Sequence, residues 1–119
     1  DSQADAKADP GQWIIGKAGN RVCRLLAGDI QFLVVEERRT FAVTEQEKVR
    51  VTGSLSHWRA ELPPQRFFRC HGSYLVNLEK IVSLEPGLGK SWSLRLAGCA
   101  AAVPVSRYFI GPLRDILRM

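Results

Sequence analysis

The sequence predicts a mostly β domain of antiparallel sheets, with one short helix in its middle and a second helix at its C-terminal end. From Trp13 onward, short runs rich in Val, Ile, Leu and Phe are separated by turn residues at roughly every 8–12 positions, which is typical of β-rich proteins. Hydrophobic residues make up 45% of the 119 residues, which is enough for one folded core. We therefore expect a single domain over residues 12–119.

The predicted strands are the segments in which β-branched and aromatic residues dominate. Gly19-Asn20 and Gly28-Asp29 are typical of tight turns and separate the first of these segments. Strands are expected at residues 13–15, 21–26, 30–36, 40–43, 48–52, 66–70, 74–77, 80–84, 91–96 and 101–105.

The short helix is predicted just after the first half of the strands. Ser54 is a typical helix N-cap residue, and Leu55, Trp58 and Leu62 follow at helical spacing before a Pro-Pro pair ends the segment.

The C-terminal helix has similar signals. Ser106 is placed to cap it, and Phe109, Leu113 and Ile116 form one apolar stripe. Pro112 lies within that stripe, so we expect it to bend the helix or to delay its start.

Positive charge is concentrated in the predicted domain. The net charge is +5, although the first ten residues contain three aspartates and one lysine. Residues 1–11 are small and polar and end in Pro-Gly, which predicts a linker or a disordered tail. Arginine provides most of the basic residues, and its guanidinium binds phosphates and guanine edges in a bidentate manner, which favours a nucleic-acid partner.

Several protein classes do not fit the sequence. No apolar run approaches the roughly 18 residues of a membrane span, and the N-terminal residues lack the order of a signal peptide. Three cysteines are an odd number, and a chain of this size has little need of disulfides. Neither a CxxC pair nor a metal-ligand spacing of histidines is present. We therefore expect a cytoplasmic domain that has no metal or other cofactor and makes no membrane contact.

Two motifs suggest enzymatic activity but lack the required context. Residues 86–91, PGLGKS, end like a phosphate-binding P-loop, yet Leu84 occupies the position of the first glycine and the segment joins two predicted strands. His71 follows Cys70 directly, and adjacent residues on a strand point to opposite faces of a sheet, so the two are poorly placed as a catalytic pair. We therefore expect a protein that is not an enzyme.

The segment FFRCHGSYLVN, residues 67–77, is the most informative part of the chain. If its two halves are strands, a loop at residues 71–73 connects them, and Arg69 and His71 are placed to approach an acidic surface. A structural histidine with its hydrogen bonds satisfied is the alternative interpretation. Asn77 is suited to satisfying backbone groups in a turn.

FFRCHGSYLVNLEKI resembles the signature of the LytTR family of bacterial DNA-binding domains, and VPVSRYFIGPLRDIL resembles the closing motif of the same family. AGDIQFLVVEERRTFAVT and TGSLSHWRAELP are similar to its earlier strands and short helix. The resemblance covers roughly residues 12 to 117. It implies an elongated β fold whose loops enter successive major grooves of double-stranded DNA.

The resemblance also implies which residues contact DNA. Three places in the chain match the loops that the family inserts, and a solvated hairpin tip is the alternative interpretation for the first of them. They are Arg38 and Arg39 in the turn at residues 36–40, Arg69, His71 and Gly72 in the second loop, and Ser106 and Arg107 at the entry to the last helix.

Gly72 departs from the family pattern, in which arginine or asparagine often follows the histidine. A glycine has no side chain to read a base, so this loop is expected to contact phosphates instead. The family further implies an upstream receiver or sensor domain and binding as pairs to repeated sites. Two other functions stay open: a β-rich ligand or protein-interaction module, and a single-strand binder of the OB type with aromatic side chains exposed for stacking.

Overall fold

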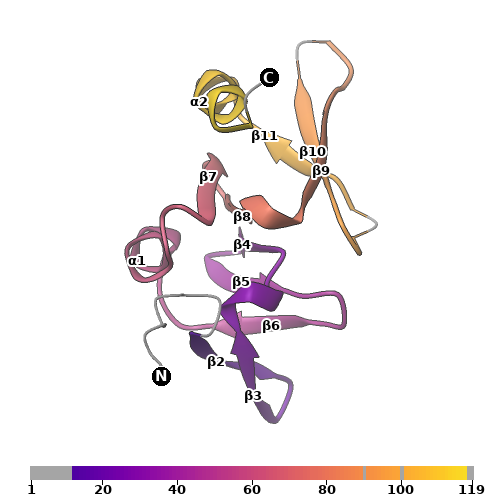
Figure 1. Ribbon diagram of the computed structural model, residues 1–119. Helices are drawn as coiled ribbons and strands as arrows, with labels where there is room; N and C mark the ends of the chain where they lie inside the picture. The colour runs from indigo at the N-terminus through magenta and orange to yellow at the C-terminus, as the bar shows by residue number, and fades with distance from the viewer. Residues whose placement is uncertain (1–11, 90, 100, 118–119) are drawn as a thin grey trace.

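The computed structural model describes residues 12–89, 91–99 and 101–117, and it confirms the mostly β architecture (Figure 1). The predicted tail, residues 1–11, lies outside the described residues. The molecule measures 42 × 34 × 25 Å along its principal axes. The elements are β2 (Trp13–Ala18), β3 (Arg21–Leu26), η2 (Ala27–Asp29), β4 (Phe32–Glu36), β5 (Arg39–Val43), β6 (Lys48–Val51), α1 (Leu55–Glu61), β7 (Phe67–His71), β8 (Tyr74–Asn77), η3 (Leu78–Lys80), β9 (Ile81–Pro86), β10 (Trp92–Leu96), β11 (Val103–Val105) and α2 (Arg107–Leu117).

The strands form two antiparallel sheets. The larger sheet has seven strands in the order β3-β2-β6-β5-β4-β8-β7, and the smaller has three in the order β11-β10-β9. Neighbours along the chain pair as hairpins in β2–β3, β4–β5, β7–β8 and β9–β10. Most strand contacts are therefore local in sequence.

Two hydrophobic cores lie on opposite faces of strand β4. Leu33 of β4 belongs to the core that includes Leu55 and Leu62 from the α1 region. Phe32 and Val34, which point to the opposite face, belong to the core that includes Leu94 of the small sheet and Leu113 of α2. The alternation of side chains along a strand thus allows β4 to hold both halves of the molecule together.

Some element boundaries differ from the prediction. Gly19-Asn20 forms the predicted hairpin turn, with Gly19 at a φ of 63°. Gly28-Asp29 instead lies in the 3-10 turn η2, which is closed by an N–H to O bond of 3.1 Å from Ile30 to Ala27. Because Ile30 closes that turn, β4 begins at Phe32 and not at residue 30.

Glycine at position 16 permits β2 and β6 to approach each other closely. A Cβ atom added there would lie 2.4 Å from Val49 Cγ1 and 2.8 Å from the backbone oxygen of Arg50. Pairing with β3 as far as Ala18 extends β2 beyond its predicted end at residue 15.

Both predicted helix caps are confirmed. Ser54 Oγ accepts a hydrogen bond from the His57 backbone N–H at 3.1 Å, and Ser106 Oγ accepts one from the Tyr108 N–H at 3.4 Å. Helix α2 begins at Arg107, so Pro112 does not delay its start. No helix in the described part of the chain is long and apolar enough to cross a lipid bilayer.

The predicted apolar stripe of α2 was wrong at its last position. Ile116 is 46% exposed, whereas Leu117 packs against the core together with Phe109 and the fully buried Leu113. Leu117 lies four residues after Leu113 and therefore shares its face of the helix.

Asn77 satisfies backbone groups in a turn, as predicted. Its Nδ2 donates to the Ile30 oxygen at 2.8 Å, and its Oδ1 accepts from the Glu79 N–H at 3.0 Å. The buried Asn77 thus connects the end of β8 to the segment just before β4.

Candidate nucleic-acid interface

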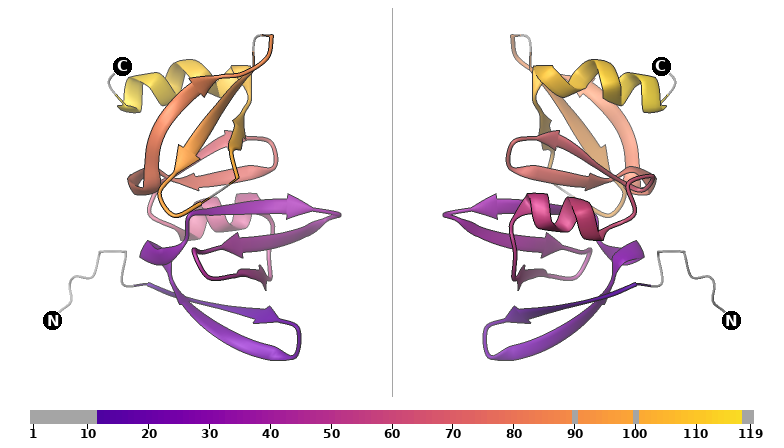
Figure 2. Two further views of the ribbon diagram at one scale, coloured as in Figure 1. Left: turned by 90° about the vertical axis from the view of Figure 1, so that its right-hand side faces the viewer. Right: turned by 90° about the vertical axis from the view of Figure 1, so that its left-hand side faces the viewer.

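The fold brings the three predicted contact positions to one side of the molecule. Figure 2 shows the tips of the β4–β5 and β7–β8 hairpins and the start of α2 on the same side. Two backbone hydrogen bonds connect them in that order, from the Val35 N–H to the Ser73 oxygen at 2.9 Å and from the Ser106 N–H to the Cys70 oxygen at 2.8 Å. Their relative positions are therefore set by the backbone.

The β4–β5 turn has an unusual backbone conformation. Glu37 and Arg38 form a two-residue turn with positive φ angles of 51° and 66°. Hairpin turns of this kind strongly favour Asn-Gly, because side chains other than glycine are strained in the left-handed region. Arg38 and the adjacent Arg39 are both exposed, so the strain holds basic side chains at the tip of a hairpin.

Arg69 and His71 are positioned by hydrogen bonds within the β7–β8 loop. Arg69 donates to the Gly72 oxygen at 2.9 Å and to Ser56 Oγ of α1 at 3.4 Å. His71 Nδ1 accepts the Ser73 backbone N–H at 3.1 Å. Because Nδ1 accepts this bond, Nε2 is the ring nitrogen that is left to donate.

Gly72 is exposed and is not required by the backbone. The positive-φ glycines among the described residues do not include it, and a Cβ atom added at Gly72 would meet nothing within 4 Å. This position therefore has room for a larger side chain.

Arg107 occupies the first position of α2 and is exposed. Its guanidinium carbon lies 5.8 Å from the centre of the Tyr108 ring. Below it, Ser106 is held by its bonds to Cys70 and to the N–H groups of Tyr108 and Phe109. The arginine side chain thus projects from a fixed base.

Cys70 lies behind the loop and does not face solvent. Burial raises the pKa of its thiol from 9.0 to about 12, and its Sγ contacts the Pro104 oxygen at 3.7 Å. A thiol in this environment stays protonated near neutral pH and is a poor nucleophile.

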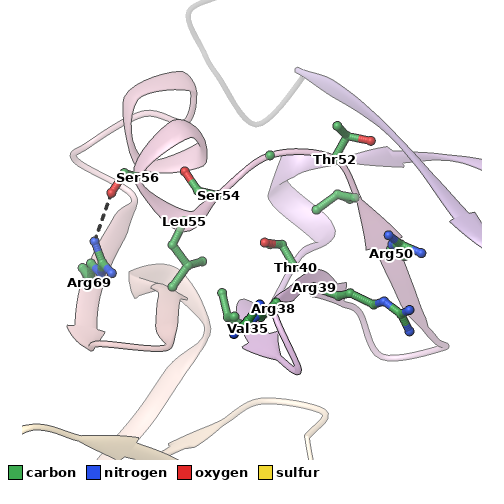
Figure 3. Close-up of a pocket in the computed structure, with 12 residues that line it drawn as sticks. Val35, Arg38, Arg39, Thr40, Arg50, Thr52, Ser54, Leu55, Ser56 and Arg69 are labelled. Atoms are coloured by element: carbon green, nitrogen blue, oxygen red, sulfur yellow. Dashed lines mark hydrogen bonds between the residues drawn. The ribbon is translucent and has the colours of Figure 1, made fainter.

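An open hollow of about 460 Å³ lies beside the first two contact positions. Figure 3 shows that Arg38 and Arg39 of the β4–β5 hairpin, Arg50 of β6 and Arg69 of β7 line it. A hollow whose lining includes four arginines suits an anionic ligand. Arg50 was missed by the sequence prediction, although the alternation Lys48-Val49-Arg50-Val51 places it on the exposed face of a strand.

Comparison with known proteins identifies this arrangement. The family model described as "LytTr DNA-binding domain" matches residues 20–118. The transcriptional regulatory protein YpdB of Escherichia coli K12 is 35% identical over 91 residues, which are 76% of this chain and 37% of that protein. The sensory transduction protein LytT of Enterococcus faecalis is 28% identical over 98 residues, 82% of this chain and 40% of that protein.

A solved structure has the same fold. It is the LytTr DNA-binding domain of a putative methyl-accepting/DNA response regulator from Bacillus cereus, with a TM-score of 0.82 and 22% identity, and the match covers 90% of this chain and 97% of that one. The chain spans about two fifths of the length of the curated relatives it matches. Because the family model covers most of the chain, the chain belongs to the LytTR family of DNA-binding domains, which act in transcription regulation.

Proposed function

We propose that this domain binds double-stranded DNA sequence-specifically, through three contact positions in successive major grooves. The observation that carries the proposal is the row formed by the β4–β5 turn, the β7–β8 loop and the start of α2, which lie on one side and are linked by backbone hydrogen bonds. The longest dimension of the molecule is 42 Å, and one turn of B-DNA spans about 34 Å, so the molecule is long enough to extend from one major groove to the next.

The side chains at the three positions suit different parts of DNA. Arg38, Arg39 and Arg107 are exposed, and an arginine fork binds the O6 and N7 atoms of guanine. His71 offers its Nε2–H donor to a base acceptor or a phosphate. Arg69 holds the oxygen of Gly72, so it shapes the loop and adds positive charge beside it. Gly72 brings the backbone close to the DNA without reading a base.

The surrounding protein is proposed from the relatives. They are regulatory proteins more than twice as long as the matched segment, which supports a cytoplasmic regulator whose upstream receiver or sensor domain controls this one. Residues 1–11 would serve as the linker, and pairs of domains would occupy repeated sites. We assign no enzymatic activity to the domain.

The alternative functions fit the described surface less well. The hollow beside Arg50 is open and lined by arginines, whereas small-molecule pockets are mostly apolar and enclosed. Among the aromatic side chains, Trp13 and Tyr108 are the ones exposed, at 49% and 78%, and they lie on β2 and α2 at opposite ends of the molecule. A base-stacking platform needs aromatics next to one another.

The direct test is binding to duplex DNA obtained by selection from a random-sequence pool, compared with single strands of the same sequence in a gel-shift assay. The duplex should bind more tightly. If about six phosphates are neutralised, affinity should fall on the order of a thousandfold between 50 and 200 mM salt. Equal binding of the single strand, or an affinity that does not change with salt, would contradict the proposal.

A further inference from the structure

A group of cations extends from Arg39 at the β4–β5 contact position across the exposed face of the large sheet. Lys17 of β2 is directly opposite Arg50 of β6, and Arg50 is directly opposite Phe41 of β5. Arg39 lies two residues from Phe41 toward the hairpin tip and so shares its face of the strand. Lys17, Arg39 and Arg50 are all exposed.

These cations are not neutralised by the acidic residues around them. Glu36 forms an ion pair with Lys48, and Glu47 forms one with Arg21. Within the described residues, no ion pair or hydrogen bond involves the side chains of Lys17, Arg39 or Arg50. Like charges directly opposite on neighbouring strands destabilise a sheet, so the Lys17–Arg50 pair has an energetic cost.

The surface around this group is hollowed and continuous with the interface. A hollow of about 350 Å³ is lined by residues that include Lys17, Arg39, Phe41, Lys48 and Arg50. Another of about 480 Å³ is lined by Lys17 and Arg50 together with Ile15, Gly16, Val22 and Thr52. Arg39 and Arg50 also line the hollow that contains Arg38 and Arg69 (Figure 3). One basic surface therefore runs from the β7–β8 loop to β2.

The β2–β3 hairpin, which carries Lys17, lies beside the row of proposed contacts. Figure 2 shows the tip of the β2–β3 hairpin on the same side as the two other hairpin tips and the start of α2, at the end of their row. Lys17 immediately precedes the last residue of β2 before that hairpin turn. A duplex that lies along the row and extends past the β4–β5 turn would pass this hairpin.

We propose that Lys17 and Arg50 form a fourth DNA contact, which binds phosphates of the backbone beyond the groove contacted by the β4–β5 turn. This inference rests on the proposed duplex binding. Lys17 and Arg50 lie on a sheet face and not at a hairpin tip, so they contact the backbone without reading bases. Arg39 lies between this contact and the β4–β5 turn.

The test compares Lys17→Ala/Arg50→Ala with the parent domain and with Lys80→Ala/Arg95→Ala, which removes the same charge elsewhere. Lys80 lines a hollow with Asp29, Glu45 and Gln46 at the end of β5 opposite the turn, and Arg95 is exposed on β10 of the small sheet. Binding to the selected duplex is measured at several salt concentrations. Melting temperatures check folding, and Lys17→Ala/Arg50→Ala should melt no lower than the parent because it relieves the like-charge contact.

Loss of two phosphate contacts should make the slope of log affinity against log salt less steep by about 1.8. Between 50 and 200 mM salt, the parent should therefore lose about 12-fold more affinity than Lys17→Ala/Arg50→Ala. The Lys80→Ala/Arg95→Ala slope should match the parent. Shortening the duplex at the end that passes the β2–β3 hairpin should weaken the parent but not Lys17→Ala/Arg50→Ala.

The outcomes separate this inference from the proposed function. A flat salt response of the parent would overturn both. A steep parent slope that is unchanged in Lys17→Ala/Arg50→Ala would overturn the fourth contact alone and would leave this face to another partner, such as an acidic protein surface. Equal flattening in Lys80→Ala/Arg95→Ala would show an effect of net charge and would also overturn the fourth contact.

Discussion

Replacing Arg107 with alanine tests the assignment of base reading to the start of α2. The side chain is exposed and contacts little beyond the Tyr108 ring at 5.8 Å, so its removal should change the free energy of unfolding by less than about 0.5 kcal/mol. A bidentate contact with guanine contributes about 1–3 kcal/mol of discrimination. Affinity for the selected site should therefore fall about 5- to 160-fold, with a much smaller loss for random duplex DNA.

Titration of fluorescently labelled duplexes, with the selected site and with a scrambled site, measures both effects. Arg107→Lys keeps the charge but not the planar fork, so it should restore binding to the scrambled duplex better than binding to the selected site. Arg114→Ala is the matched control, because Arg114 is exposed on the same helix toward its C-terminal end.

Two results would refute the assignment of Arg107. One is full affinity of Arg107→Ala for the selected site. The other is an equal loss on the selected and scrambled duplexes, which would make Arg107 a phosphate contact. A marked drop in melting temperature would also count against base reading, because it would mean that the side chain stabilises the helix.

The remaining predictions concern the other two loops and the buried thiol. Gly72→Arg should fold normally, because a Cβ atom there meets nothing within 4 Å. It should also tighten DNA binding or change the preferred base. A folded variant with unchanged affinity and base preference would place the loop outside the groove. Arg38→Gly should raise the free energy of unfolding by about 1 kcal/mol in denaturant titrations, because glycine adopts the positive φ of 66° without strain. The same change should weaken DNA binding. A lower free energy of unfolding would show that the backbone at Arg38 is not strained. The pKa of the Cys70 thiol is 9.0 in the unfolded chain and about 12 in the folded domain, so the folded state binds more protons between these pH values. The free energy of unfolding should therefore fall by up to about 1.4 kcal/mol per pH unit as the pH rises through this range. Cys70→Ala should make this fall smaller in denaturant titrations at several pH values. A parent domain whose free energy of unfolding is constant from pH 9 to 12 would refute the prediction.

Local patterns in the sequence were sufficient for most of the fold. Strands β3 and β8 have the predicted bounds, and Ser54 and Ser106 cap helices as expected, because alternation and capping are properties of neighbouring residues. The side of α2 that packs was partly missed, since Ile116 and Leu117 are equally apolar and only the position of the neighbouring core distinguishes them.

The candidate site was predictable only in part. The three loops were found by resemblance, but the strained Glu37-Arg38 turn was not, because neither residue signals a positive φ. Arg50 was missed for a different reason. Its importance comes from facing Lys17, more than 30 positions away in the sequence, and the register of two strands determines that pairing.

The two backbone hydrogen bonds that connect the hairpin tips and α2 have a consequence for how such regulators diverge. Amide and carbonyl groups are the same in almost every residue, so substitutions at the tips leave the distance between contacts unchanged. Under the proposed base reading, single codon changes at the tips would change the bases that are preferred, whereas a new spacing between the contacted bases would require an insertion or deletion that alters the hairpins. Paralogues of this domain should consequently differ in which bases they prefer while sharing one helical phasing of those bases.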